Sequence, residues 1–331
     1  MTNEACSKQS GLLGRAYRLT LGSVSWQLRA GEGLEDWLAR LARILELEPE
    51  PEDSSLKPGE RRIYFVRSEL KDLAGSSWKK LDELSFPDCP RTGWQKKQIH
   101  PLQLWTHPQS PSIICQTVID DSLSPDMPIE AMMRVFYPVF EELIEAGGGP
   151  LHAALVSRDG FGVALAASGG TGKSTCARRI PAPWSPICDD TVLIIPDGHQ
   201  GYVAHPSPTW SDYLWRRSER TWRISDSVPL RAVFFLKQAE EDKASAIGQG
   251  EAAIYLSRSM NDILIPFSRR LSPEENRAFE HRVFDNVCRL AKALPAFVLE
   301  ARLEGEFWKE MDRILAVSRE DLRESNGRDR P

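Results

Sequence analysis

The sequence has no run of about 18 consecutive apolar residues, the length that a membrane-spanning helix requires. Its first residues, MTNEACSKQSG, contain no long apolar segment after a basic start, so they do not resemble a secretory signal. The six cysteines are scattered without a CxxC pair, which argues against a zinc ribbon and against a disulfide framework. We therefore expect a soluble protein of the reducing cytoplasm with no membrane partner.

The sequence also lacks an excess of basic residues. Lys and Arg number 42 against 47 Asp and Glu, which gives a net charge of -5 at neutral pH. Because nucleic acid attracts basic surfaces, we expect no nucleic-acid partner, although a local basic patch is compatible with these totals. The 331 residues suffice for roughly two domains. No internal repeat is visible, and the sequence leaves the oligomeric state open.

The first part of the chain shows secondary-structure patterns but no chemical motif. The alternation in YRLTLGSVSWQLRA predicts a hairpin, and GLEDWLARLARILELE predicts an amphipathic helix. An acidic, proline-bearing stretch, EPEPEDSSLKPGE, reads as a loop before the strand-like RRIYFVRS. Residues 85–112 have no readable pattern. We assign residues 1–148 to an α+β N-terminal region of unknown role.

A strand and a long helix are expected to close this N-terminal region. PSIICQTVIDD is the strand, and MPIEAMMRVFYPVFEELIEAGGG is the helix. Pro128 suits the first helical turn, whereas Pro138 should kink the helix interior. Gly147 to Gly149 should end the helix.

From residue 149 onward, short strands alternate with helices. LHAALVS and FGVALAAS, joined by the turn RDGFG, predict a hairpin, and further strands are expected at TVLIIPD, LRAVFFLKQ and AAIYLSR. SPEENRAFEHRVFDNVCRLAKAL, capped by Ser272, and EGEFWKEMDRILAVSRED predict helices. We expect an α/β domain, a mixed sheet with flanking helices, over residues 149–320, and a disordered tail at 321–331.

A glycine-rich stretch, ALAASGGTGKSTCARRIP, lies between one of these strands and a helix start. Glycines let successive backbone amides point at anionic oxygens, a lysine reaches terminal phosphates, and a hydroxyl binds Mg²⁺. The stretch supplies these groups in that order, which predicts a nucleotide-binding P-loop made of Ser168, Gly169, Gly170, Thr171, Gly172, Lys173, Ser174 and Thr175. Ala167 stands where the usual pattern has its first glycine. The alternative is a glycine turn with an incidental lysine.

An acidic pair follows the glycine-rich stretch. Asp189 and Asp190 end the run PICDD, and adjacent carboxylates repel each other unless a cation or a proton lies between them. One could bind a metal while the other accepts a proton from an attacking hydroxyl. The alternative is a solvated pair at a turn. Asp197, in PDGHQG, reads as a turn former. No LSGGQ-like or NKxD motif is present, which argues against a transporter ATPase and against guanine recognition.

Residues 151–195 resemble the nucleotide-binding core of the HPr kinase/phosphorylase family. In that family a histidine precedes the P-loop lysine by about twenty residues, and an Asp-Asp pair follows it by a little under twenty; here His152 lies 21 residues before Lys173, and Asp190 lies 17 residues after it. HPSPTWSDYLW and VPLRAVFFLKQ further resemble relatives found in radical-SAM peptide-modification cassettes, closest to the SynChlorMet cassette protein C group.

The resemblance implies a P-loop core of the HPr kinase type that binds ATP and Mg²⁺. It places His152 beside the phosphate site, and it implies catalytic roles for His152, Asp189 and Asp190, with Ser174 and Asp189 at the metal. The expected activity is transfer of the γ-phosphoryl group to a hydroxyl of a peptide or protein. A non-catalytic nucleotide-binding partner of a maturation enzyme and a small-molecule kinase remain as alternatives.

A cluster of arginines interleaved with tryptophans lies downstream of the acidic pair. The spacing predicts a helix that carries Arg216, Arg217, Arg220 and Arg223. It favours a solvated face with Trp215 and Trp222 in the core over recognition of an acidic peptide. His205 and Trp210 are expected in a packed connection rather than a substrate loop.

Overall fold

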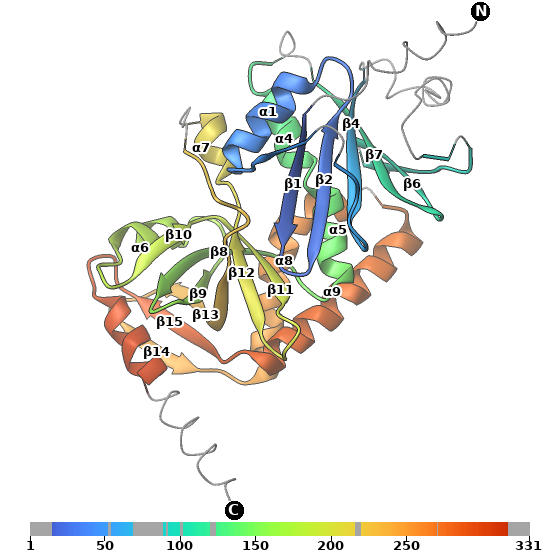
Figure 1. The fold of residues 1–331 in the computed structure, drawn as a ribbon. Coiled ribbons are helices and arrows are strands. Elements are labelled where there is room, and N and C mark those ends of the chain that lie inside the picture. The colour runs from blue at the N-terminus through green and yellow to red at the C-terminus, as the bar shows by residue number, and fades with distance from the viewer. Residues whose placement is uncertain are drawn as a thin grey trace, which may run out of the picture.

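The computed structural model describes residues 15–51, 54–68, 89–90, 92–99, 102–119, 124–215, 220–269 and 271–316. These residues form two mixed sheets that lie side by side and are flanked by helices (Figure 1). The expectation of an α/β protein with mixed sheets is therefore confirmed. Arg216, Arg217 and the expected tail at 321–331 lie outside the described residues.

The first sheet has the strand order β3-β1-β2-β4-β7-β6-β5. The β2–β4 and β4–β7 pairs are parallel, and the remaining pairs are antiparallel. The predicted hairpin is confirmed as β1–β2, whereas β3 lies in the expected loop, and β5 and β6 occupy the unreadable stretch. Its strands are β1 (Ala16–Leu21), β2 (Val24–Ala30), β3 (Pro49–Glu50), β4 (Arg61–Ser68), β5 (Gln95–Ile99), β6 (Leu102–His107) and β7 (Ser110–Val118).

Three helices pack on this sheet: α1 (Glu35–Ile44), α4 (Met127–Arg134) and α5 (Tyr137–Glu145). The apolar face predicted for α1 is buried, and Trp37 makes an edge-to-face contact with Phe65 of β4. The kink predicted at Pro138 is wrong. The helix ends at Arg134, and Pro138 lies in the first turn of α5, where a residue without an N–H loses no helical hydrogen bond.

The second sheet contains the strands that follow residue 148. The pairings close β8, β9, β13, β12 and β11 into a ring, and β13 is parallel to both β9 and β15. The predicted hairpin is confirmed as β8–β9, where Asp159 and Gly160 adopt the positive φ of a two-residue turn. The strands are β8 (Gly149–Arg158), β9 (Phe161–Ala166), β10 (Ser185–Cys188), β11 (Thr191–Pro196), β12 (Tyr202–Pro206), β13 (Val228–Gln238), β14 (Lys243–Ala246) and β15 (Ala296–Ala301).

Two long helices link the sheets, since α8 packs against β8 and α9 packs against both α8 and α5. The helices of this half are α6 (Lys173–Arg179), α7 (Trp210–Trp215), α8 (Gln249–Ser268) and α9 (Pro273–Ala293), and residues 307–316 are also helical. The capping box predicted at Ser272 is confirmed. Among the described residues, no helix combines the length and apolar character that crossing a membrane requires.

The strand predicted at AAIYLSR is wrong, because these residues lie inside α8. A short apolar run is compatible with either a strand or a buried helix. In α8, Ala252, Leu256, Ser259 and Met260 recur at helical spacing and are buried against the second sheet. The tertiary contacts therefore select the helix.

The predicted arginine helix is also corrected. Helix α7 ends at Trp215, and residues 220–223 continue without regular structure. The backbone N–H of Trp222 donates to the carbonyl of Ile44 at the end of α1. Trp222 is buried as expected, but Trp215 is 80% exposed.

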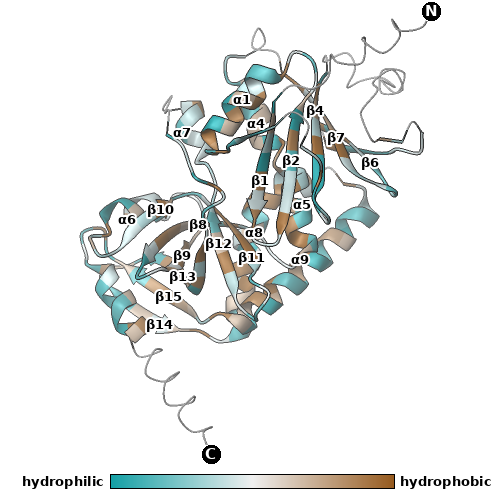
Figure 2. Ribbon diagram, in the orientation of Figure 1, coloured by the Kyte–Doolittle hydropathy of each residue, from teal (hydrophilic) through white to brown (hydrophobic). Residues whose placement is uncertain are grey.

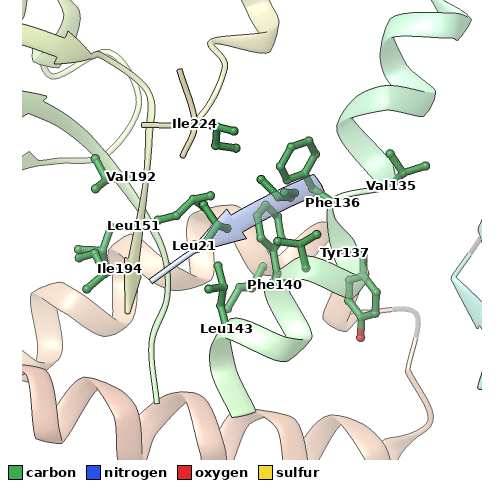
Figure 3. Packing of buried hydrophobic residues seen from close by; sticks show 14 of the residues in the cluster. Leu21, Val135, Phe136, Tyr137, Phe140, Leu143, Leu151, Val192, Ile194 and Ile224 are labelled. Atoms are coloured by element: carbon green, nitrogen blue, oxygen red, sulfur yellow. The ribbon is translucent and has the colours of Figure 1, made fainter. Parts of the chain in front are cut away.

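The two sheets share one hydrophobic core. Figure 3 shows Leu21, Phe140 and Leu143 facing Leu151 and Val192 of the second sheet. In Figure 2 the inner strands β8, β9 and β13 are largely hydrophobic. The division at residue 148 stays a prediction, and the core is continuous across it.

Candidate functional site

The glycine loop, residues 167–172, connects the end of β9 to the start of α6. Gly170 has a φ of 78° and Gly172 a φ of 113°, which is the left-handed region that favours glycine. A Cβ added at Gly169, Gly170 or Gly172 would meet no atom within 4 Å. Gly170 and Gly172 therefore serve the backbone conformation, and the space beside all three glycines is open.

Lys173 reaches back over the glycine loop. Its Nζ donates to the carbonyl of Ala167 at 2.8 Å and lies 3.4 Å from the carbonyl of Ser168. The residue is only 6% exposed. Burial lowers the pKa of Lys173, and the nearby charges of Asp190, Asp262 and Asp189 oppose that effect. The ammonium group is thus held at the loop, where the negative charges of three aspartates act on it.

The acidic pair lies between two strands that follow the same edge of β8. Cys188 of β10 pairs with Leu155 of β8, and Thr191 of β11 pairs with His152 of β8. The antiparallel register against β8 is therefore the same before and after Asp189 and Asp190. Successive residues of an extended chain point to opposite sides. Asp189 and Asp190 therefore face different surroundings.

Asp189 points into the protein. It is 8% exposed, and its Oδ1 accepts a hydrogen bond of 2.6 Å from the hydroxyl of Thr209. Its backbone carbonyl lies 3.4 Å from Oγ of Ser174, which places the start of α6 beside the pair. Its Oδ2 has no hydrogen bond to any described residue. Asp189 is thus held in place and retains one carboxylate oxygen for a ligand.

Asp190 points toward His152. Its Oδ1 lies 3.5 Å from Nε2 of the imidazole, and its side chain is 37% exposed. The other ring nitrogen, Nδ1, lies 3.2 Å from Oδ2 of Asp262 on α8. The hydroxyl of Ser259, one turn earlier on α8, donates to the backbone carbonyl of His152. The imidazole therefore lies between two carboxylates, and α8 is bonded to β8 at the same residue.

The sequence did not predict Asp262. The sequence favours a strand for residues 252–258 of α8, so the residues that share a helix face with Ser259 could not be assigned. A helical reading of SRSMNDIL would have placed Ser259 and Asp262 one turn apart. That spacing is the only sequence signal for this residue.

The remaining predicted candidates do not reach the site. Oδ1 of Asp197 accepts from the backbone N–H groups of His199 and Gly201, so Asp197 is a turn former as expected. His205 is 2% exposed, and its Nε2 accepts from the backbone N–H of Gly22 in the β1–β2 turn. His205 and Trp210 therefore belong to a packed connection.

The oxygen groups of the site fit Mg²⁺ bound together with phosphate. Within the described part of the chain, no group of three or more His, Cys, Asp or Glu residues is arranged to hold a metal ion. Mg²⁺ is usually held by one or two carboxylates together with substrate phosphates and water, so a protein cage is not required. The hydroxyl of Ser174 and the free oxygen of Asp189 are donors of the required kind.

Two pockets border the glycine loop. The α8-side pocket, of about 120 Å³, is lined by Ser168, Tyr255, Arg258 and Asp262, among others. The α6-side pocket, of about 620 Å³, is lined by Gly170, Thr175, Arg179 and the ends of β13 and β15. The loop thus has a small pocket on the side of His152 and Asp262 and a large one on the side of α6.

Comparison with known proteins assigns the family. The sequence model of the SynChlorMet cassette protein ScmC family matches residues 113–316. The chain belongs to this family. The resemblance to the SynChlorMet cassette group is therefore confirmed, and the matched range begins in β7, so it includes α4 and α5 as well as the second sheet.

No curated protein matches the chain. Among solved structures, the HPr(Ser) kinase/phosphatase from Coxiella burnetii aligns with 53% of this chain and 98% of its own, at 9% sequence identity and a TM-score of 0.27. A TM-score this low does not establish a common fold.

Proposed function

We propose that this protein is an ATP-dependent kinase that transfers the γ-phosphoryl group to a hydroxyl of a peptide or protein. The observation that carries the proposal is the contact of Asp190 with His152 beside the buried Lys173. A loop that only binds nucleotide does not require an oriented carboxylate next to the lysine. A phosphoryl transferase does, because it must accept the proton of the attacking hydroxyl.

In this proposal Ser168 to Thr175 form a P-loop. Backbone amides of the open glycine loop bind phosphate oxygens, and Lys173 turns from the carbonyls of Ala167 and Ser168 to the terminal phosphate. Ala167 in place of the usual first glycine is compatible with this role, because its contact with Lys173 is made by its backbone carbonyl, which any residue provides.

Ser174 and Asp189 are the proposed metal ligands. The bond from Thr209 fixes one oxygen of Asp189, and the other remains for the metal. When bound, Mg²⁺ supplies positive charge beside the β- and γ-phosphate oxygens.

Asp190 is the proposed proton acceptor. The acceptor oxygen forms a bond to the γ-phosphorus, the bond from that phosphorus to the β,γ-bridging oxygen breaks, and ADP leaves with the electron pair. The hydroxyl proton passes to the carboxylate of Asp190. His152 orients this carboxylate, and Asp262 holds the imidazole from the other side.

Family membership supports a peptide acceptor, because the matched description is that of a cassette protein. The resemblance of HPSPTWSDYLW to relatives found in peptide-modification cassettes points the same way. We place the reaction in the cytoplasm, where ATP is available.

The test is incubation of the purified protein with Mg²⁺, γ-labelled ATP and a panel of acceptors that includes short peptides encoded beside its gene. Label on a peptide hydroxyl, lost in Asp190→Asn, supports the proposal. His199→Gln, in an exposed turn, is the control and should retain transfer. ATP binding without transfer to any acceptor would favour a non-catalytic partner, and label on a small molecule alone would exclude the peptide.

A further inference from the structure

The α6-side pocket lies where three parallel strands end. Strands β9, β13 and β15 run in the same direction, so the segments that follow them meet at one edge of the sheet. In open α/β sheets, ligands bind in the crevice outside the carboxyl ends of the strands. The glycine loop follows β9, and residues 239–240 and 302–303 follow the other two strands and line the pocket. The pocket is therefore continuous with the glycine loop.

The wall of the pocket is fixed by hydrogen bonds rather than formed by a loose loop. Arg179 of α6 donates to the carbonyls of Gly305 at 2.6 Å and of Arg302 at 3.4 Å. Asp242 accepts from the backbone N–H groups of Arg302, at 2.7 Å, and of Glu306, at 2.5 Å. The segment after β15 is thus bonded from both sides. A site preorganised in this way loses little conformational entropy when a ligand binds.

A further contact joins the pocket to the glycine loop. The side-chain amide of Gln238, the last residue of β13, lies 3.3 Å from the carbonyl of Thr171. Gly170, Thr171 and Gly172 border the pocket directly. A ligand on the loop can therefore extend into the pocket without crossing another part of the chain.

The size and chemistry of the pocket indicate its occupant. Its volume of about 620 Å³ is within the range of small-molecule sites, and the α8-side pocket of about 120 Å³ is far smaller. Leu236, Ala239 and Leu303 provide apolar contacts, and Leu303 is 75% exposed at the rim. Arg179 and Glu240 add polar groups of both charges. A flat heterocycle joined to a polar sugar has matching features.

We propose that the α6-side pocket binds the nucleoside part of a nucleoside triphosphate whose phosphates lie on the glycine loop. This inference rests on the proposed function and adds the orientation of the nucleotide on the glycine loop. The nucleoside lies on the α6 side, and the γ-phosphate points toward His152 and Asp190. The acceptor hydroxyl then approaches from the side of the α8-side pocket.

The test compares ATP with inorganic tripolyphosphate, both with Mg²⁺, by equilibrium titration of the full-length protein. We expect ATP to bind at least about tenfold more tightly than tripolyphosphate. Ala239→Trp, which fills the pocket, should reduce ATP affinity to that of tripolyphosphate and leave tripolyphosphate affinity unchanged. Ala246→Trp, at the exposed end of β14, is the matched control and should leave both affinities unchanged.

Leu303→Ala provides a second variant at an exposed position, where folding is not at risk, and should weaken ATP binding alone. Equal wild-type affinities for the two ligands, or an ATP preference that survives Ala239→Trp, would overturn the nucleoside pocket while leaving the phosphate site intact. Failure of both ligands to bind would overturn the proposed function as well.

Discussion

His152 and Asp262 lie 110 residues apart in the chain, yet Nδ1 of the imidazole lies 3.2 Å from Oδ2 of the carboxylate. The packing of α8 against β8 produces this contact, and Ser259 bonds the helix to the same residue. An imidazole held at Nδ1 has a fixed ring orientation, so Nε2 is directed at Asp190. In the proposed mechanism Asp262 is thus a positioning residue that acts through His152.

Removal of this carboxylate should slow phosphoryl transfer and leave nucleotide binding unchanged. We expect Asp262→Ala to lower the transfer rate by about tenfold or more, because His152, which orients the proton acceptor Asp190, loses the carboxylate that holds its ring. Asp262→Asn keeps an oxygen acceptor for Nδ1 and should restore part of the rate. The measurement is the rate of phosphoryl transfer together with the dissociation constant of ATP.

The matched control is Asp285→Ala. Asp285 pairs with His281 at 3.3 Å on the exposed surface of α9, which is a similar contact away from the site. Loss of the Asp285 carboxylate should change neither the transfer rate nor the dissociation constant of ATP. If Asp262→Ala transferred phosphate as fast as the control, Asp262 would have no positioning role in the reaction.

The two aspartates of the pair should differ in their effect on stability. Asp189→Ala leaves the hydroxyl of the buried Thr209 without its partner, so we expect the free energy of unfolding to fall by about 1–3 kcal/mol. The half-exposed Asp190 makes only the longer contact with His152, so Asp190→Ala should change stability by less than about 0.5 kcal/mol. Urea unfolding of both variants measures the difference. Equal losses of unfolding free energy in the two variants would contradict the finding that Asp189 points into the protein and Asp190 points outward.

Stability should depend on pH through His205. Its Nε2 accepts from Gly22 and its Nδ1 lies 3.0 Å from the carbonyl of Ile224, so the neutral ring fits the site. Burial lowers the pKa of His205 below its usual value of 6.5. The neutral ring therefore contributes stability that is fully present above pH 6.5 and is lost as the pH falls toward the lowered pKa.

His205→Gln removes this titration. Between about pH 7.5 and about pH 5 the wild type should lose more unfolding free energy than the variant does. His199→Gln, in the exposed turn after β11, should follow the wild type. Parallel pH dependence of wild type and His205→Gln would contradict the assignment.

Elements with a strong local signal were predictable from the sequence. The capping box at Ser272 set the start of α9, and the Asp-Gly turn set the β8–β9 hairpin. Pro138 was misjudged because a proline suits a first helical turn as well as it disrupts an interior, and pattern alone does not show where a new helix begins.

The candidate site was only partly predictable. The glycine loop and the spacing of His152 and Asp190 around Lys173 are local in sequence. Asp262 and the α6-side pocket are not, because they exist only when α8 packs on β8 and when the ends of β13 and β15 meet. A sequence pattern reports neighbours along the chain, whereas these groups become neighbours through tertiary packing.

The most direct test of the central claim is calorimetric titration of the full-length protein with ATP and Mg²⁺, beside Lys173→Met. The account predicts saturable one-to-one binding that is lost in Lys173→Met and retained in Arg178→Gln, which changes an exposed residue of the same helix. Absence of ATP binding by the wild type, or undiminished binding by Lys173→Met, would contradict it.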